Sequence, residues 1–264
     1  MRDKSLAAHL LKSFKDKYLL DITPAMISDY KLQRRTEGAS PRTINYELTL
    51  MSHAFNIAIL EWEWVKENPV TKVKKERVNN AIECWLTQDE EERLLRVSAK
   101  WLQEIIIFAI HTGLRQSEIL DLKWSQVNMA RRTMIISEQK NRGVDTLPLN
   151  ETAMGVLRER QKEKLCEYVF PSSNQTRIMN RNVFRAFEIA TDKAKVHNFR
   201  FHDLRHTFAT RLVQSGVGIY EVQRLGRWKN ASMVMRYAHH NPESLRSSID
   251  ERNNGIGDKG LGGI

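Results

Sequence analysis

Cysteine is scarce in this sequence of 264 residues, which contains only Cys84 and Cys166. The two lie far apart and no C-x-x-C pair occurs, which argues against a disulfide framework and a cysteine zinc site and fits a reducing cytoplasm. Long apolar runs are missing as well, because the most apolar stretch, IIIFAI at 105–110, is too short to span a bilayer. The N-terminal MRDKSLAAHLLKSF predicts an amphipathic helix rather than a signal peptide. We therefore expect a soluble, cytoplasmic protein.

Acidic residues are in the minority. Asp and Glu number 32 against 42 Lys and Arg, which gives a formal net charge of +10. This excess favours an anionic partner such as DNA or RNA, although ribosome-associated proteins and many ordinary enzymes share it. With 41% hydrophobic and 28% charged residues, the chain has the composition of a folded protein of one or two domains.

The first 71 residues have a helical pattern throughout. Thr23 and Ser40 each stand directly before a proline, the arrangement of a capping side chain followed by proline at the first helical position. Asn68-Pro69 ends this region, and the polar, basic segment that follows has no core pattern. We expect a helical domain over residues 1–71 and an interdomain linker over 72–83.

The second region, residues 84–254, opens with the capping box of Thr87-Gln88-Asp89-Glu90. Short strands at 133–137 and 144–149 predict a hairpin with Lys140-Asn141-Arg142-Gly143 in its turn. The glycine-rich end, 255–264, predicts a flexible tail. The expected fold is mainly α with a small β-sheet: a helical domain plus a mixed α/β domain. Besides the helix that follows the capping box, helices are predicted over 101–111, 151–164, 180–194, 202–215 and 231–238.

The stretch FHDLRHTFAT at 201–210 places His202, Arg205 and His206 beside the apolar face of a predicted helix. The two histidines have the i, i+4 spacing of some zinc sites. The metalloprotease version of that pattern needs glutamate where Asp203 stands, and no third ligand set is evident. A metal is therefore not expected.

Three further residues stand out, each with an ordinary alternative. Arg115 follows the glycine turn of TGLRQSEIL at a helix start, where Glu118 can form an ion pair with it. Lys140 in the hairpin turn is, by itself, a solvated lysine. Tyr237, in RYAHH after a helical stretch, is by itself a packing residue. None of these signals is specific when taken singly.

Taken in order, however, the set R…K…H-x-x-R…W…Y resembles the tyrosine recombinase (phage integrase) family. The resemblance extends to INYELTLMSHAFNIAILEW followed by ENPV, which is similar to the family's helical core-binding domain. Trp228 stands where many relatives have histidine, and Arg227 before it occupies a position where a small residue is common. The N-terminal arm-binding domain of many integrases is not evident. The residues that carry the resemblance are Arg115, Lys140, His202, Arg205, Trp228 and Tyr237.

The resemblance implies breakage and rejoining of DNA through a 3′-phosphotyrosine at Tyr237. Arg115 and Arg205 are then expected to hold the non-bridging oxygens of the phosphate with forked hydrogen bonds. Lys140 would donate a proton to the leaving 5′ oxygen, and His202 would take the proton from the tyrosine.

Supporting roles follow from the same resemblance. Trp228 would donate an indole hydrogen bond to the phosphate and hold the tyrosine helix in place. Glu118 and His206 would orient their neighbours. No cofactor is implied, and no metal, since arginines would stabilise the charge that magnesium stabilises elsewhere.

The implied partner is double-stranded DNA with specific attachment or core sites. The family acts as a homotetramer on synapsed DNA, so a monomer or dimer is expected off DNA, with residues 243–254 as the segment exchanged between protomers. An accessory DNA-bending protein is a further partner that the resemblance allows. The place of action would be a prokaryotic nucleoid, with the gene in a host, a phage or a mobile element. Contacts to the DNA backbone are expected from Arg42, Lys72, Lys74, Lys75 and Arg77.

Three alternatives stay open. A type IB topoisomerase shares the chemistry but joins no second site, a DNA-binding regulator would keep the fold without the chemistry, and a basic RNA-associated protein would make the ordered set a coincidence. The separate helical core-binding domain and the RYAH ending favour a recombinase over a topoisomerase. The complete set of side chains favours an enzyme over a regulator.

Overall fold

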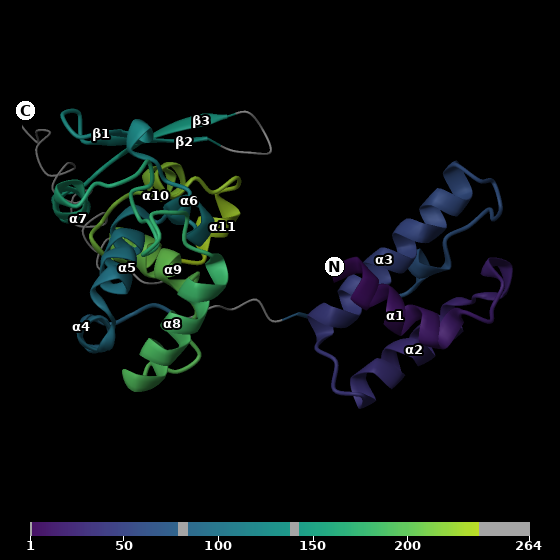
Figure 1. Ribbon diagram of the computed structural model, residues 1–264. Helices are drawn as coiled ribbons and strands as arrows, with labels where there is room; N and C mark the ends of the chain where they lie inside the picture. The colour runs from purple at the N-terminus through teal and green to yellow at the C-terminus, as the bar shows by residue number, and fades with distance from the viewer. Residues whose placement is uncertain (1, 79–83, 138–142, 238–264) are drawn as a thin grey trace, which may run out of the picture. The chain divides into compact units, whose positions relative to one another are not determined.

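The protein is described by a computed structural model that covers residues 2–78, 84–137 and 143–237. The chain divides into two compact units, the first unit Met1–Ile82 and the second unit Glu83–Ile264. Both consist mainly of helices, and the second also carries a small sheet (Figure 1). The predicted fold class, mainly α with one small β-sheet, is confirmed.

The described part of the first unit contains three helices, and the caps predicted at Thr23 and Ser40 are both present. The Thr23 hydroxyl accepts a hydrogen bond from the Met26 amide, and the Ser40 hydroxyl accepts one from the Thr43 amide, each ahead of a proline in the first helical turn. The helices bury Ile27, Ile44, Leu48 and Phe55 between them. The elements are α1 (Arg2–Phe14), α2 (Pro24–Thr36) and α3 (Pro41–Leu60), with 3-10 turns η1 (Leu19–Asp21) and η2 (Pro69–Lys72).

A buried carboxylate ties α2 to α3. Glu47 is fully buried and accepts hydrogen bonds from the Tyr30 hydroxyl at 2.8 Å and from the Arg34 guanidinium at 2.8 and 3.0 Å. Burial, followed by the hydrogen bond to Glu47, raises the pKa of Tyr30 above its usual range. Removing one partner of such a pair leaves a buried charge without compensation, which typically costs about 3–5 kcal/mol.

The first residues of the predicted linker are packed against the first unit. Glu76 pairs with Lys31 and Arg35 of α2, and the Asn45 side chain of α3 bonds both the amide and the carbonyl of Glu76. Lys31 also donates to the Lys74 carbonyl. The polar composition that predicts a linker therefore reflects ion pairs along the surface of a folded unit.

In the second unit, the capping box predicted at Thr87 and Glu90 is confirmed by both of its reciprocal hydrogen bonds. The predicted hairpin is also present, with Thr133 opposite Pro148 and Ser137 opposite Val144 in an antiparallel register. The helices are α4 (Gln88–Val97), α5 (Lys100–Thr112), α6 (Gln116–Leu120), α7 (Glu151–Lys162), α8 (Asn180–Lys193), α9 (Asp203–Gln214), α10 (Ile219–Gly226) and α11 (Ser232–Met235). The sheet order is β1 (Val127–Asn128), β2 (Thr133–Ser137), β3 (Val144–Pro148), with a 3-10 turn η3 (Trp124–Gln126) before β1.

Several elements of the second unit differ from the sequence-based prediction. The helix α10 and the two-residue strand β1 were not predicted. The helix predicted over 231–238 spans only Ser232–Met235 within the described residues.

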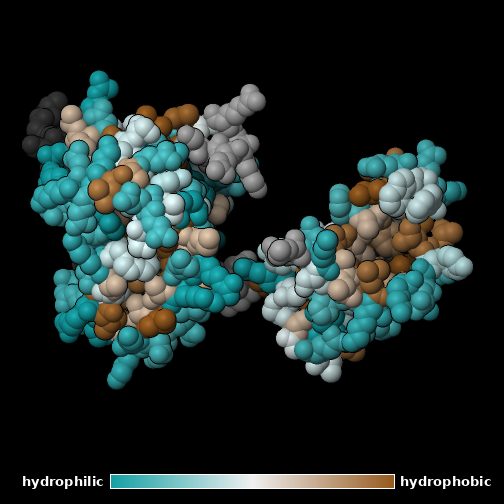
Figure 2. Space-filling model, in the orientation of Figure 1, coloured by the Kyte–Doolittle hydropathy of each residue, from teal (hydrophilic) through white to brown (hydrophobic). Residues whose placement is uncertain are grey.

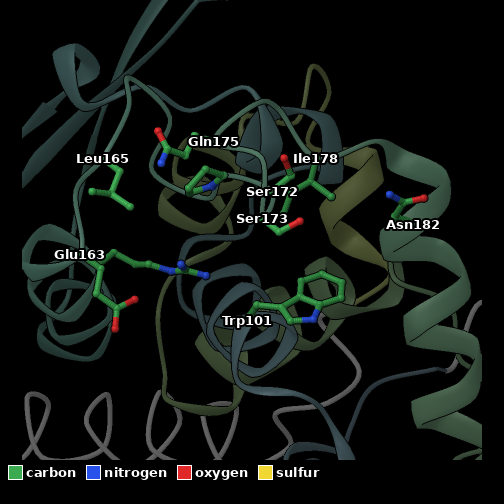
Figure 3. A pocket seen from close by; sticks show the side chains of 10 residues that line it. Trp101, Glu163, Leu165, Ser172, Ser173, Gln175, Ile178 and Asn182 are labelled. Carbon is green, nitrogen blue, oxygen red and sulfur yellow. The ribbon is translucent and has the colours of Figure 1, made fainter.

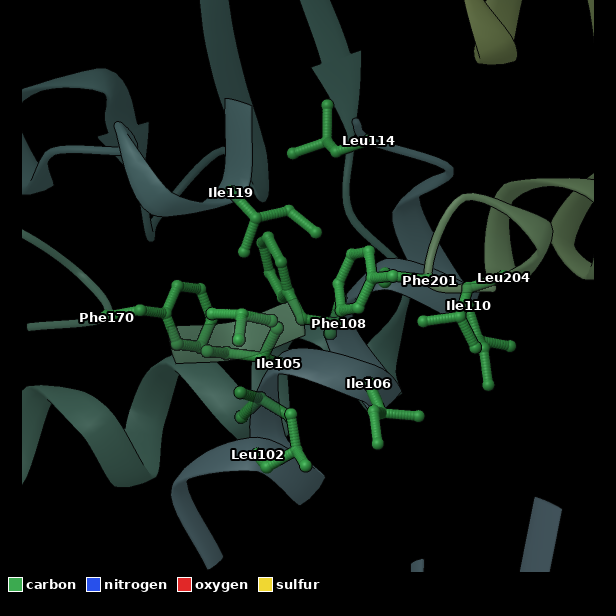
Figure 4. Packing of buried hydrophobic residues seen from close by; sticks show 14 of the residues in the cluster. Leu102, Ile105, Ile106, Phe108, Ile110, Leu114, Ile119, Phe170, Phe201 and Leu204 are labelled. Carbon is green, nitrogen blue, oxygen red and sulfur yellow. The ribbon is translucent and has the colours of Figure 1, made fainter. Parts of the chain in front are cut away.

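The core of the second unit is built around α5, which packs against α7 and α9. Phe108 of α5 meets Phe170 with ring centroids 5.2 Å apart, and Phe201 and Leu204 close the cluster from the start of α9 (Figure 4). Because α5 ends at Gly113 and α9 begins at Asp203, this packing brings the TGLRQSE turn and the HDLRH turn together.

The surface of the first unit carries several exposed hydrophobic side chains. Trp62 and Trp64 stack with ring centroids 4.5 Å apart, although 51% and 62% of their respective surfaces are exposed, and Leu60 beside them is 80% exposed. Figure 2 shows hydrophobic residues among hydrophilic ones on the visible face of both units. Within residues 2–78, 84–137 and 143–237, no helix is long and apolar enough to cross a membrane.

Candidate active site

The turn between α5 and α6 positions Arg115. Gly113 ends α5 with φ at +64°, in the left-handed region, and a Cβ added there would lie 2.4 Å from the Phe208 ring of α9. Glycine is thus required twice, by the backbone conformation and by the close approach of the two helices. Arg115 then stands at the N-cap of α6, with its side chain 44% exposed.

Glu118 holds Arg115 at two points. One carboxylate oxygen accepts from the Arg115 backbone amide at 2.8 Å and the other from its guanidinium at 2.7 Å. Burial acts to raise the pKa of Glu118, but the Arg115 amide and the charges of Arg227 and Arg115 outweigh it, so that the pKa lies below its usual value. The carboxylate is therefore ionised at neutral pH, and the predicted ion pair is present.

Arg205 is buried at the centre of the site and joins two turns. Its guanidinium donates to the Gly113 carbonyl at 2.5 Å and to the Gly226 carbonyl, and it lies 4.4 Å from the centre of the Trp228 ring. Arg205 belongs to α9, whereas the two carbonyl groups belong to the residues at the C-terminal ends of α5 and α10. Burial, then the charge of Arg115, lowers the pKa of Arg205 to about 10, which keeps it cationic at neutral pH.

The turn after α10 places Trp228 and Arg227. A Cβ on Gly226 would lie 1.6 Å from the Trp228 ring, so the indole can pack flat against the chain only at a glycine. Arg227 follows with φ at +52°, unusual for a residue with a side chain, and its guanidinium donates to Glu118. One carboxylate therefore accepts from Arg115 and Arg227 at once.

Tyr237 is buried, with only 3% of its surface exposed, and its hydroxyl is hydrogen-bonded to Nδ1 of His206. The Trp228 ring lies 5.9 Å away on another side. Burial raises the pKa of Tyr237 to about 12, and burial, then the charge of His202, lowers the pKa of His206 to about 4. A protonated tyrosine thus faces a neutral imidazole, and the imidazole Nε2 lies 4.0 Å from Asp203.

The prediction that His202 is the base for Tyr237 finds no contact to support it among the described residues. His202 is exposed at the start of α9, and its ring meets His206 edge-on at 5.4 Å, whereas the ring that contacts the tyrosine hydroxyl is that of His206. The reason is helical geometry: His206 lies one turn further along α9, on the buried side that faces the segment of Tyr237.

The other predicted residues divide into two groups. Lys140 lies outside the described residues, as do residues 243–254. Each of the basic residues expected on DNA has its side chain exposed on the first unit, and Lys72 pairs there with Glu67. These five exposed basic residues are Arg42, Lys72, Lys74, Lys75 and Arg77.

Among the described residues, no group of three or more His, Cys, Asp or Glu side chains is placed to hold a metal.

Two hollows in the second unit differ in their relation to this cluster. One of about 490 Å³ lies between Trp101, Leu165 and Ile178 (Figure 3), and none of the predicted site residues lines it. Another of about 720 Å³ is lined by His202 and Arg200. The arginine cluster combines two buried side chains, Arg205 and Arg227, with the partly exposed Arg115.

The structure brings together five of the six residues that carry the resemblance: Arg115, His202, Arg205, Trp228 and Tyr237. Together with Arg227 and with the neutral His206 at the tyrosine hydroxyl, they form a cationic cluster beside a tyrosine. Such an arrangement can bind an anionic diester and activate an oxygen nucleophile beside it.

Comparison with known proteins shows the family of the chain. Residues 84–244 match the family model described as Phage integrase family, and residues 1–77 match that of the phage integrase N-terminal domain. The chain belongs to the phage integrase family.

Among curated relatives, the integrase of Salmonella phage P22 is 33% identical over 223 residues, and the shufflon-specific DNA recombinase of Escherichia coli is 32% identical over 244 residues. These alignments cover 80% and 88% of this chain but only 57% and 62% of the relatives. Among solved structures, a lambda integrase tetramer bound to a Holliday junction superposes with a TM-score of 0.76 at 22% identity, covering 89% of this chain and 70% of that one, which shows a shared fold.

Proposed function

We propose that this protein is a site-specific DNA recombinase that breaks and rejoins strands through a 3′-phosphotyrosine at Tyr237. The observation that carries the proposal is the single helix α9, which sets Arg205 between the turns of Arg115 and Trp228 and, one residue on, sets His206 against the tyrosine. Helix α9 thus links a phosphate-binding arginine to the residue that contacts the nucleophile.

The reaction follows from these positions. The Tyr237 oxygen attacks phosphorus and forms the Oη–P bond, while its proton passes to Nδ1 of His206, which the hydrogen bond already joins to it. Arg115 and Arg205 stabilise the charge that gathers on the non-bridging oxygens. The bond from phosphorus to the 5′ oxygen breaks, and that oxygen takes a proton, for which Lys140 is the donor that the family resemblance implies.

Rejoining is the same reaction in reverse. A 5′ hydroxyl attacks the phosphotyrosine and gives its proton to Lys140, the P–Oη bond breaks, and the other proton returns from His206 to the tyrosine oxygen. Because one phosphodiester replaces another, the exchange needs no external energy source. In this scheme Trp228 holds the tyrosine segment, and His202, exposed beside the site, contacts the DNA phosphate.

In the first unit, residues 1–71 would form the core-binding domain and bind the DNA backbone without sequence specificity. Residues 84–254 would form the catalytic domain. Support comes from the five exposed basic side chains and from the match to the family's N-terminal domain. We further propose that the protein acts in the bacterial cytoplasm as a homotetramer on two synapsed DNA sites. The protomers would exchange residues 243–254, and an accessory DNA-bending protein would be a further partner. The lambda integrase tetramer on a Holliday junction supports the assembly by analogy.

The decisive experiment mixes the protein with a nicked duplex that carries a candidate attachment site. A nick lets the cleaved fragment diffuse away, so the covalent complex accumulates and appears as a slow band on a denaturing gel. The matched control is Tyr237→Phe, which keeps the ring packed against Trp228 but removes the nucleophile. We expect a band with the unchanged protein and none with the variant.

A band of equal strength with Tyr237→Phe would show that another residue is the nucleophile. If the protein shifts the duplex on a native gel but forms no band, the fold serves binding without chemistry. A band together with relaxation of supercoiled DNA, but without joining of two sites, would indicate a topoisomerase instead.

A further inference from the structure

Arg227 has a place in the site that the family pattern does not assign to it. It ends α10 in the left-handed conformation, at φ +52°, where a small residue is common in relatives. Its side chain is nevertheless only 4% exposed, because the guanidinium folds back toward Glu118, 109 residues away in the sequence. A long charged side chain in a backbone conformation that favours glycine calls for a compensating interaction.

The charges around Arg227 do not balance. Arg115 and Arg227 both donate to the same oxygen of Glu118, and the hydrogen bonds that Arg205 makes within the described ranges go to backbone carbonyls. Glu118 is therefore the one carboxylate that contacts this group of three guanidiniums among the described residues, which leaves two positive charges. Buried charge of one sign is unfavourable unless an anion completes the site.

The donors of Arg227 point to the same conclusion. Its Nη2 is taken by Glu118, but its Nη1 is buried and has no hydrogen-bond partner among the described residues. Buried guanidinium nitrogens are normally satisfied, so a free donor in a cluster of arginines marks the place of a missing acceptor.

We propose that Arg227 is a third phosphate-binding arginine, whose free Nη1 donates to a non-bridging oxygen of the phosphodiester at which the strand is cut. The inference rests on the proposed function and adds to it a residue that touches the substrate. Glu118 sets the orientation of Arg115 and Arg227 together, so that both guanidiniums are held in place before DNA arrives.

A neutral phosphate analogue separates this role from a structural one. A methylphosphonate replaces one non-bridging oxygen by a methyl group and removes the negative charge from the phosphorus centre. If Arg227 neutralises that charge, a variant without the guanidinium loses less on the methylphosphonate than on the natural diester. Distorted packing would reduce the rate equally on both.

The experiment measures the rate of covalent complex formation on nicked duplexes with a phosphodiester or a methylphosphonate at the cut position. The variants are Arg227→Ala and Arg227→Gly, the second because glycine adopts φ +52° without strain. Arg224→Ala, an exposed arginine of the same helix α10, is the matched control. We expect both Arg227 variants to be slower on the diester by on the order of 100-fold, and to approach the rate of the unchanged protein on the methylphosphonate.

Each other outcome overturns the inference in a recognisable way. Equal losses on both substrates assign Arg227 a structural role, and rescue by a methylphosphonate only at a neighbouring position assigns it to another phosphate. Normal rates with Arg227→Gly show that its guanidinium is dispensable. Failure of the unchanged protein to form any covalent complex overturns the proposed function itself, and the inference with it.

Discussion

Acid destabilises the second unit through His206. Burial, followed by the charge of His202, holds the pKa of this histidine at about 4 in the folded protein, against 6.5 for an ordinary histidine. The unfolded chain therefore takes up a proton as the pH falls through about 6.5, while the folded chain does not. Stability is unaffected above that range, falls as the pH drops from about 6.5 to about 4, and levels off below it.

The magnitude follows from the two pKa values. At about 1.4 kcal/mol for each pH unit between them, the folded state loses about 3 kcal/mol relative to the unfolded chain by about pH 4. Three groups face the His206 ring. The Tyr237 hydroxyl is hydrogen-bonded to Nδ1, Asp203 lies 4.0 Å from Nε2, and the His202 ring meets it edge-to-face. Asp203 is the anion that opposes the effect, but its carboxylate is already bonded to Arg200.

The variant His206→Asn tests this account, because the amide can still accept a hydrogen bond from Tyr237 but does not titrate. Urea unfolding followed by tryptophan fluorescence, at steps between about pH 7 and about pH 4, gives the free energy of unfolding of each protein. We expect the unchanged protein to lose about 3 kcal/mol more than the variant over this range. His197→Asn, an exposed histidine of the same unit, is the control.

Parallel curves for the unchanged protein and His206→Asn would refute the reasoning, since the loss would then come from other groups. A steeper loss in His206→Asn would point to the opposite sign of the effect. Either result would also weaken the role of a neutral His206 as acceptor for the tyrosine proton.

Three further predictions concern other parts of the chain. Glu47→Ala should destabilise the first unit by about 3 kcal/mol, because the buried Arg34 guanidinium then loses both hydrogen bonds to Glu47 and keeps only its pair with Glu37; urea unfolding measures it, and a loss below that of Glu47→Gln would contradict it. Lys140→Ala should slow formation of the covalent complex on ordinary DNA but not on DNA with a 5′-bridging sulfur, since a thiol with a pKa of about 8.5 leaves without a proton donor; equal slowing on both would exclude lysine as the acid. Changing the five exposed basic residues of the first unit to alanine should reduce the slope of log affinity against log salt by about 4, and an unchanged slope would remove them from the DNA interface.

Local features of the sequence predicted local features of the structure. The caps at Thr23, Ser40 and Thr87 and the pair of Arg115 with Glu118 all span three residues, so the pattern contains both partners. Helix α10 was also within reach of such reasoning, because Ile219, Val222 and Leu225 repeat at helical spacing.

Contacts between distant segments were not predictable in the same way. The choice between His202 and His206 depends on which side of α9 faces Tyr237, 31 residues further on, and only the fold determines this. The role of Arg227 likewise depends on Glu118, 109 residues earlier. The family resemblance indicated which residues belong to the site, whereas packing determined which of them touch.

The hydrogen bonds of Arg205 have a consequence for the newly made chain. This arginine reaches a carbonyl 92 residues before it and another 21 residues after it. Its guanidinium is therefore held in place only when α5, α9 and α10 have all assembled. Under the proposed function, a nascent or partly unfolded molecule has the tyrosine but lacks the aligned cation, and we expect it not to cut DNA. The contacts that complete the fold would then also switch on the chemistry.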